Sequence, residues 1–175
     1  MQHIRRGDRP AKDHSEDVKS NEASYASNHD SNVPYPEPSI NESNETKLEV
    51  FIADDSTEIR NRLIEMLKEN KSIHLMGESG DAEQTIIALR NLKPDVVILD
   101  IHMPKGDGMR VLKDIKTIDP GRIVIIFTAF PYPQYRQAYL TAGADYFFDK
   151  TNDVQKMVDI LAELAQKHFI NNTEK

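Results

Sequence analysis

The chain has 175 residues, enough for one domain with a tail, and it carries no cysteine. The lack of cysteine excludes a disulfide scaffold, a thiolate zinc site and a cysteine nucleophile. The net charge of -7 argues against a general nucleic-acid binder, because such proteins carry a surplus of cations that neutralises phosphates.

The first 47 residues differ from the rest of the chain. Their few large apolar residues follow neither helical nor strand spacing and lie among Ser, Asn, Asp, Glu and Pro. Such a segment cannot bury enough apolar area to offset its ordering entropy. We therefore predict a disordered tail over 1–47, a folded domain over 48–170 and a short C-terminal tail over 171–175. The stretch VPYPEP at 33–38 is typical of a stiff linker or of a polyproline segment that an aromatic groove binds.

From Leu48 onward, short apolar runs alternate with helical patterns. Strands are predicted at 48–53, 72–77, 95–100, 122–127 and 145–148, because these runs are short and rich in apolar and β-branched residues. Each is followed by apolar side chains at helical spacing, as at Ile59 and Leu63. The second helix begins with the capping pattern Asp81-x-x-Gln84, and the fourth ends at Gly143.

Five βα units in a row predict a parallel sheet that helices cover on both faces, joined by right-handed crossovers. A closed barrel needs eight such units. We therefore predict an α/β fold, a flavodoxin-like doubly wound (βα)5 parallel sheet with strand order 2-1-3-4-5. In this order the first and third strands are neighbours, and the active crevice lies beyond their carboxyl ends.

Three carboxylates meet in that crevice. The first strand ends in Asp54 and Asp55, and the third ends in Asp100. Like charges at this range repel and raise one another's pKa, so the cluster needs a cation. Oxygen ligands with room for water suit Mg²⁺, or a similar hard divalent ion such as Mn²⁺. Asp55 taken alone is also compatible with a helix cap, since Glu58 follows three residues later.

The other strand ends add a hydroxyl and an ammonium. The fourth strand ends in Thr128, and the fifth runs into Lys150. This arrangement fits the transfer of a phosphoryl group onto Asp100, because metal and ammonium neutralise its oxygens while the hydroxyl donates to one of them. Taken singly, Thr128 is compatible with a helix cap and Lys150 with a solvated surface charge.

The stretch from about Leu48 to His168 resembles the receiver domain of bacterial two-component response regulators. The matching motifs are FIADDS, VVILDIHMPKGDG, IIFTA and GADYFFDK. The resemblance implies that Asp100 accepts a phosphoryl group from a sensor histidine kinase or a phosphotransfer protein. It also implies a set of site residues: Asp54, Asp55, Asp100 and the main-chain carbonyl of His102 as Mg²⁺ ligands, Thr128 as switch hydroxyl, Phe147 as switch aromatic and Lys150 as pairing lysine.

Two positions depart from the family pattern. The family places a proline with a cis peptide bond after its lysine, whereas Thr151 follows Lys150 here. A cis bond before a residue other than proline costs about 3 kcal/mol, so we predict a trans bond. His102 and Phe130 flank the acceptor, and we hypothesise that they set the lifetime of the phospho-aspartate.

The chain predicts a stand-alone receiver, because neither tail is long or patterned enough for a DNA-binding output domain. We expect a cytoplasmic signalling domain and not an enzyme acting on outside substrates. The resemblance implies that its output is contact with an unidentified protein target through the fourth helix, fifth strand and fifth helix. We expect no direct DNA or membrane binding. One alternative is a phosphatase with an aspartate nucleophile, in which His102 replaces the usual acid/base carboxylate. The other is a constitutive interaction domain.

Overall fold

The computed structural model describes residues 47–173, so the tail predicted over 1–47 lies outside the described residues except for Lys47. Five strands form one parallel sheet in the order β2-β1-β3-β6-β7, which confirms the predicted order 2-1-3-4-5. The strands are β1 (Leu48–Ala53), β2 (Ile73–Ser79), β3 (Val96–Leu99), β6 (Ile123–Thr128) and β7 (Tyr146–Asp149).

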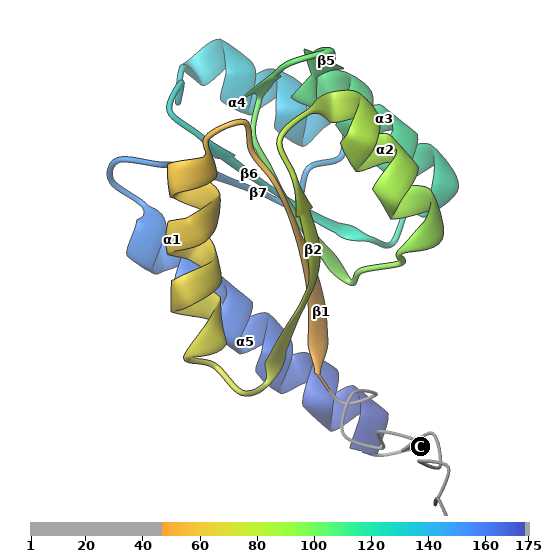
Figure 1. Cartoon of the computed structure of the whole chain (residues 1–175), viewed down its shortest axis with the longest axis vertical. Helices are drawn as coiled ribbons and strands as arrows, with labels where there is room; N and C mark the ends of the chain where they lie inside the picture. The colour runs from red at the N-terminus through yellow and green to blue at the C-terminus, as the bar shows by residue number, and fades with distance from the viewer. Residues whose placement is uncertain (1–46, 174–175) are drawn as a thin grey trace, which may run out of the picture. The chain divides into compact units, whose positions relative to one another are not determined.

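Helices cover both faces of the sheet (Figure 1). They are α1 (Thr57–Lys68), α2 (Ala82–Asn91), α3 (Gly108–Ile118), α4 (Pro133–Thr141) and α5 (Val154–Thr173). Buried apolar residues of α1 and α5 form one core with one face of the sheet, and those of α2, α3 and α4 form a second core with the other face. The central strand β3 is buried along its whole length, which is why its sequence is continuously apolar.

Carboxylate and hydroxyl caps set where the first three helices begin. Ser56 accepts a hydrogen bond from the Ile59 amide at 3.3 Å and begins α1. Asp81 accepts from the Gln84 amide at 2.8 Å, which confirms the predicted start of α2. Asp107 caps α3 in the same way. Each cap satisfies an amide that the first turn leaves without a helical partner. The capping residue therefore fixes the position at which each helix begins.

A small hairpin between β3 and α3 was not predicted. Its strands are β4 (His102–Met103) and β5 (Gly106–Asp107), paired antiparallel. Lys105 adopts a left-handed backbone conformation, with φ of 58°, at the turn. At the start of α3, a Cβ on Gly108 would lie 2.3 Å from the main-chain oxygen of Asp100. The hairpin therefore folds the start of α3 tightly against the residue that follows β3.

Helix α5 continues through Thr173, so residues 171–173, which the sequence assigned to a tail, are helical. The Thr173 hydroxyl donates to the main-chain oxygen of Phe169 at 2.8 Å, a contact between residues four apart that is common in helices. The last turns of α5 extend past the edge of the sheet, as Figure 1 shows.

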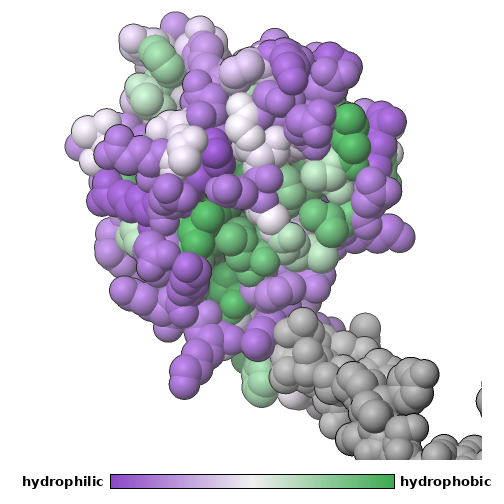
Figure 2. Space-filling model, viewed as in Figure 1, coloured by the Kyte–Doolittle hydropathy of each residue, from purple (hydrophilic) through white to green (hydrophobic). Residues whose placement is uncertain are grey.

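Figure 2 shows an apolar strip on the face that Figure 1 presents, bordered by polar side chains. This face contains β2, the edge strand, on which Ile73 and Leu75 are half-buried because β2 has a neighbour on one side alone. Among residues 47–173, no helix combines the length and apolar character needed to span a bilayer.

Candidate functional site

Side chains from three strand ends meet at the carboxyl edge of the sheet. Asp54 follows β1, Asp100 follows β3 and Lys150 follows β7. The Lys150 Nζ lies 2.6 Å from Asp54 Oδ2 and 2.8 Å from Asp100 Oδ2, so one ammonium bridges two carboxylates. All three side chains are buried, with Asp54 at 1% and Asp100 at 5% exposure. The predicted juxtaposition of acids and lysine is therefore present in the structure.

The second oxygen of each buried carboxylate is held by the backbone. Asp54 Oδ1 accepts a hydrogen bond from the Ser56 amide at 3.0 Å. Asp100 Oδ1 accepts from the Ile101 amide at 2.7 Å. Main-chain donors on one side and Lys150 on the other fix the rotation of both carboxylates, so their positions are preset before any ligand arrives.

Asp55 is exposed and completes a cluster of three acids with Asp54 and Asp100. One carboxylate oxygen from each lies within 4.8 Å of the other two, a spacing and donor set that fit a hard divalent ion such as Mg²⁺. Burial raises the pKa of Asp54, and hydrogen bonding and charge from Lys150 oppose this rise. A cation at the cluster would favour the ionised form in the same way as Lys150 does.

The structure resolves the alternative readings of three site residues. Ser56, and not Asp55, caps α1. The Thr128 hydroxyl accepts from the Phe130 amide at 3.1 Å, and the cap position of α4 is Tyr132, so Thr128 is not a helix cap. The Lys150 side chain is 9% exposed, so it is not a solvated surface charge.

Phe147 lies on β7 in the second core and is 4% exposed, so its ring already faces inward. The Arg136 guanidinium lies 4.8 Å above its ring centre, and the Tyr139 ring lies 6.5 Å away at a steep angle. Burial raises the pKa of the Tyr139 phenol well above its ordinary value. Both contacts come from α4, and the sequence analysis missed them because α4 carries little helical amphipathicity from which to assign its faces.

An aromatic cluster surrounds His102, one of the two residues predicted to flank the acceptor. The His102 ring centre lies 4.5 Å from that of Phe130, the other predicted residue, and 5.9 Å from that of Tyr135. Tyr132 contacts both Phe130 and Tyr135. Phe130 and Tyr132 remain 41% and 51% exposed. The cluster joins β4 to the start of α4, a link that no local pattern in the sequence signals.

The loop after Lys150 is built without a cis peptide bond, as expected from Thr151 at the position of the family's proline. Asp149 organises this loop: its carboxylate accepts from the Thr151 amide at 2.8 Å and from the Asn152 side chain at 2.6 Å. The Asp149 amide in turn donates to the Asp153 carboxylate at 3.2 Å. These contacts support the chain on both sides of Lys150.

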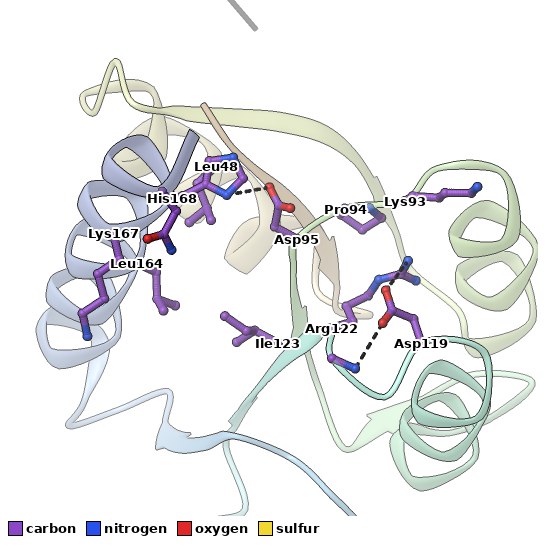
Figure 3. A pocket seen from close by; sticks show the side chains of 12 residues that line it. Leu48, Lys93, Pro94, Asp95, Asp119, Arg122, Ile123, Leu164, Lys167 and His168 are labelled. Atoms are coloured by element: carbon purple, nitrogen blue, oxygen red, sulfur yellow. Dashed lines mark hydrogen bonds and ion pairs between the residues drawn. The ribbon is translucent and has the colours of Figure 1, made fainter. Parts of the chain in front are cut away.

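A cavity of about 600 Å³ lies at the opposite, amino edge of the sheet, between α5 and the starts of β1, β3 and β6 (Figure 3). Its two carboxylates are already engaged: Asp95 accepts from the Glu49 amide at 2.8 Å, and Asp119 lies 3.3 Å from Arg122 Nη2. Size alone therefore does not mark the site, because the acids, hydroxyl and lysine with the expected chemistry gather at the other edge.

The comparison with known families matches residues 50–162 to the response regulator receiver domain. The match covers more than half of the chain and includes both acid-bearing strand ends. The chain belongs to this family.

Individual relatives agree with this assignment. The uncharacterized transcriptional regulatory protein YxjL of Bacillus subtilis is 28% identical over 74% of this chain. Protein CcdB of the same organism is 32% identical over 66% of this chain and 95% of its own length. The CheX-CheY-BeF3-Mg+2 complex from Borrelia burgdorferi superimposes with a TM-score of 0.58 and 28% identity, over 65% of this chain and 88% of that one.

The relatives differ in how much sequence they carry beyond the shared domain. The chain spans 60% of the length of the Bacillus regulator YxjL. It spans 30% to 39% of three matched protein-glutamate methylesterases. The matched region thus makes up less than half of the methylesterases but nearly all of CcdB.

Proposed function

We propose that this receiver domain accepts a phosphoryl group on Asp100 from a sensor histidine kinase or a phosphotransfer protein and thereby changes its contacts with a protein target. The observation that carries the proposal is the convergence of Asp54, Asp100 and Lys150 within hydrogen-bonding distance at the carboxyl edge of the sheet. A buried, fixed carboxylate beside an ammonium is suited to in-line attack on phosphorus.

In the proposed step, a carboxylate oxygen of Asp100 forms a bond to phosphorus while the bond from phosphorus to the donor breaks, and the donor leaves with that electron pair. Lys150 pairs with a phosphoryl oxygen once the group has arrived, which releases it from its bridge between the two acids. The Thr128 hydroxyl, buried at 0% exposure, donates to another phosphoryl oxygen.

Asp54, Asp55, Asp100 and the main-chain carbonyl of His102 are the proposed ligands of Mg²⁺. Bound there, the ion would neutralise negative charge on the phosphoryl oxygens. Mn²⁺ accepts the same oxygen donors and is expected to substitute for it. The three proposed carboxylate ligands come from the ends of β1 and β3, which the order of the sheet makes neighbours.

The proposed output is a change in protein contacts rather than chemistry on an outside substrate. Thr128 moving toward the phosphoryl group would couple the site to Phe147 and to the surface of α4, β7 and α5. The relative CcdB, which the chain covers at 95% of its length, supports a receiver that works without a joined effector domain. We propose a cytoplasmic location and no direct contact with DNA, since the net charge of -7 gives the chain no surplus of cations to neutralise phosphates.

Treatment with acetyl phosphate and Mg²⁺, followed by intact-mass analysis, tests the proposal. The wild-type chain should gain one phosphoryl group, and Asp100→Asn should gain none. Asp107→Asn is the matched control, because Asp107 is an exposed nearby carboxylate and asparagine preserves its cap on α3. Uptake by Asp100→Asn, or no uptake by the wild type from any donor, would contradict the proposal. Continuous release of phosphate from a small phosphoester would instead support the phosphatase alternative.

A further inference from the structure

Arg60 on α1 reaches back over the loop that carries the two adjacent aspartates. Its Nη1 donates to the main-chain oxygen of Asp54 at 2.8 Å and to that of Asp55 at 3.3 Å. Its Nη2 donates to the Thr57 hydroxyl at 3.1 Å, and its Nε pairs with Glu78 on β2 at 3.1 Å. The side chain is 13% exposed, so the guanidinium lies against the loop rather than in solvent.

We propose that Arg60 is a positioning residue for the divalent-cation site, an inference that rests on the function proposed above. Its guanidinium fixes the peptide units that follow β1 by holding two successive carbonyl oxygens. Because these units carry Asp54 and Asp55, their orientation decides whether both carboxylates converge on Asp100. Arg60 therefore controls the affinity of the site for Mg²⁺ without touching the ion.

The pairing with Glu78 explains how the positively charged Arg60 can lie beside a binding site for a divalent cation. A positive charge near the acids opposes the binding of Mg²⁺, and the Glu78 carboxylate compensates the guanidinium charge from β2. The planar guanidinium also offers several donors in a fixed arrangement, which the ammonium of a lysine does not. The effects of charge and of position thus have opposite signs: removing the charge tightens Mg²⁺ binding, whereas losing the position weakens it.

Gly80 leaves the space that the guanidinium occupies. A Cβ at residue 80 would lie 3.2 Å from Arg60 Nη1 and 3.8 Å from the main-chain oxygen of Asp54. A larger side chain there would displace the guanidinium and remove no charge. Gly80 therefore offers a way to disturb the position of Arg60 separately from its charge.

Calorimetric titration of the 175-residue chain with Mg²⁺ provides the first test. Arg60→Gln should weaken Mg²⁺ binding by about tenfold, the lower end of what losing the support of a metal ligand costs. Arg62→Gln, an exposed position on the same helix, removes the same charge from α1 and should leave the affinity unchanged. Equal or tighter binding by Arg60→Gln would mean that charge dominates and would overturn the inference.

Two further variants keep every charge. Arg60→Lys loses the planar arrangement of donors, and Gly80→Val displaces the guanidinium. Both should also weaken Mg²⁺ binding. Unaltered affinity in both would overturn the inference. Thermal unfolding without Mg²⁺ identifies any variant that fails to fold, and the remaining variant then decides.

Phosphoryl uptake gives a second readout that a general loss of structure would not reproduce. In Arg60→Gln, the uptake rate should recover to the wild-type value at saturating Mg²⁺, because a weaker ion site is filled at higher concentration. A rate that stays low at every Mg²⁺ concentration would contradict positioning through the metal. If Asp100→Asn still takes up phosphate, the proposed function fails, yet the Mg²⁺ affinities still decide the role of Arg60.

Discussion

At the scale of single residues, the site is defined by a lysine that bridges two buried acids. Lys150 compensates both Asp54 and Asp100 at 2.6 Å and 2.8 Å, and its own side chain is 9% exposed. Burying three charged groups is tolerated because each has a partner and the backbone satisfies the remaining carboxylate oxygens. The same bridge places an ammonium close to where a divalent ion and a phosphoryl group would bind.

Replacing Lys150 with methionine should destabilise the protein strongly. Two buried carboxylates then lose their partner, and removing one member of a buried ion pair costs about 3–5 kcal/mol. Mg²⁺ should restore part of this loss, since the ion supplies the missing positive charge. Urea unfolding with and without Mg²⁺ measures both effects.

Lys156→Met is the matched control for this experiment. Its ammonium pairs with Asp153 on the surface and is 71% exposed, so its loss should cost less than about 1 kcal/mol. A similar loss of stability in both variants, or no rescue of Lys150→Met by Mg²⁺, would show that the bridge does not have the proposed role.

His102 and Phe130 should slow the hydrolysis of the phospho-aspartate. Their rings lie 4.5 Å apart and link β4 to the segment before α4, and we expect this pair to restrict the approach of water to Asp100. We expect His102→Ala and Phe130→Ala each to lose phosphate about fivefold faster, which corresponds to about 1 kcal/mol in the barrier. Leu140→Ala, exposed on α4 outside the cluster, should keep the wild-type rate. Unchanged rates in both ring variants would remove the hypothesis.

At the scale of elements, the close packing of α3 onto the end of β3 shapes the loop that follows the proposed acceptor, Asp100. A Cβ on Gly108 would meet the main-chain oxygen of Asp100 at 2.3 Å, so Gly108→Ala must push α3 away from the acceptor. We expect a loss of about 1–3 kcal/mol in the free energy of unfolding and slower phosphoryl uptake. Gly121→Ala, whose Cβ would make an ordinary contact at 3.5 Å, should change stability by less than about 0.5 kcal/mol. Equal effects would contradict this role of the packing.

The cap of α2 predicts a dependence of stability on pH. The amide of Gln84, followed by Lys105, holds the pKa of Asp81 below its ordinary value of 3.8. The contribution of Asp81 to folding stability is therefore present above pH 3.8. It is lost as the pH falls through the lower pKa that Asp81 has in the folded state. Asp81→Asn preserves the cap but does not titrate. The difference in melting temperature between the two proteins should shrink as the pH falls below 3.8, and a constant difference would contradict this linkage.

The sequence predicts an element when the pattern that indicates it lies within that element's own residues. The apolar run of β3 and the capping pattern at Asp81 are local, and both appear where they were expected. Strands β4 and β5 have two residues each, too few for any periodicity, and so they were missed. The last turn of α5 was missed because polar residues there carry no helical pattern.

The candidate site was predictable in its members but not in its contacts. The sheet order alone brings the ends of β1 and β3 together, so Asp54 and Asp100 were expected as neighbours. The bridge that Lys150 forms between them follows a loop that Asp149 holds through Thr151, where the sequence departs from the family's proline. The contact of Arg136 with Phe147 depends on the rotation of α4, which its weak pattern does not encode.

At the scale of the whole molecule, the two edges of the sheet have different roles. The carboxyl edge gathers the acids, the hydroxyl and the lysine, whereas the amino edge holds a cavity whose carboxylates already have partners. Two separate cores, one on each face, hold the strands that define both edges. The helices of the proposed output surface, α4 and α5, belong to different cores, so a shift at β7 between them affects both faces.

Stability of the whole domain should couple Mg²⁺ to pH through Asp54. Burial raises the pKa of Asp54 above 3.8, so the folded state keeps this proton at a pH where the unfolded chain releases it. Without metal, the contribution of Asp54 to folding stability is fully present below pH 3.8. It is lost as the pH rises through the pKa of Asp54 in the folded state. Mg²⁺ bound at the proposed site would reverse this trend, because it would bind the ionised carboxylate and compete with the proton.

The stabilisation by Mg²⁺ should therefore grow as the pH rises from 3.8 and then level off, reaching about 2.7 kcal/mol at a hundredfold excess over the dissociation constant. Thermal unfolding at fixed Mg²⁺ across this range measures the increase. Asp54→Asn removes the titrating group, so its smaller Mg²⁺ effect should vary less with pH than the effect on the wild type. If the stabilisation by Mg²⁺ changed no more with pH in the wild type than in Asp54→Asn, Asp54 would not be a ligand of the ion.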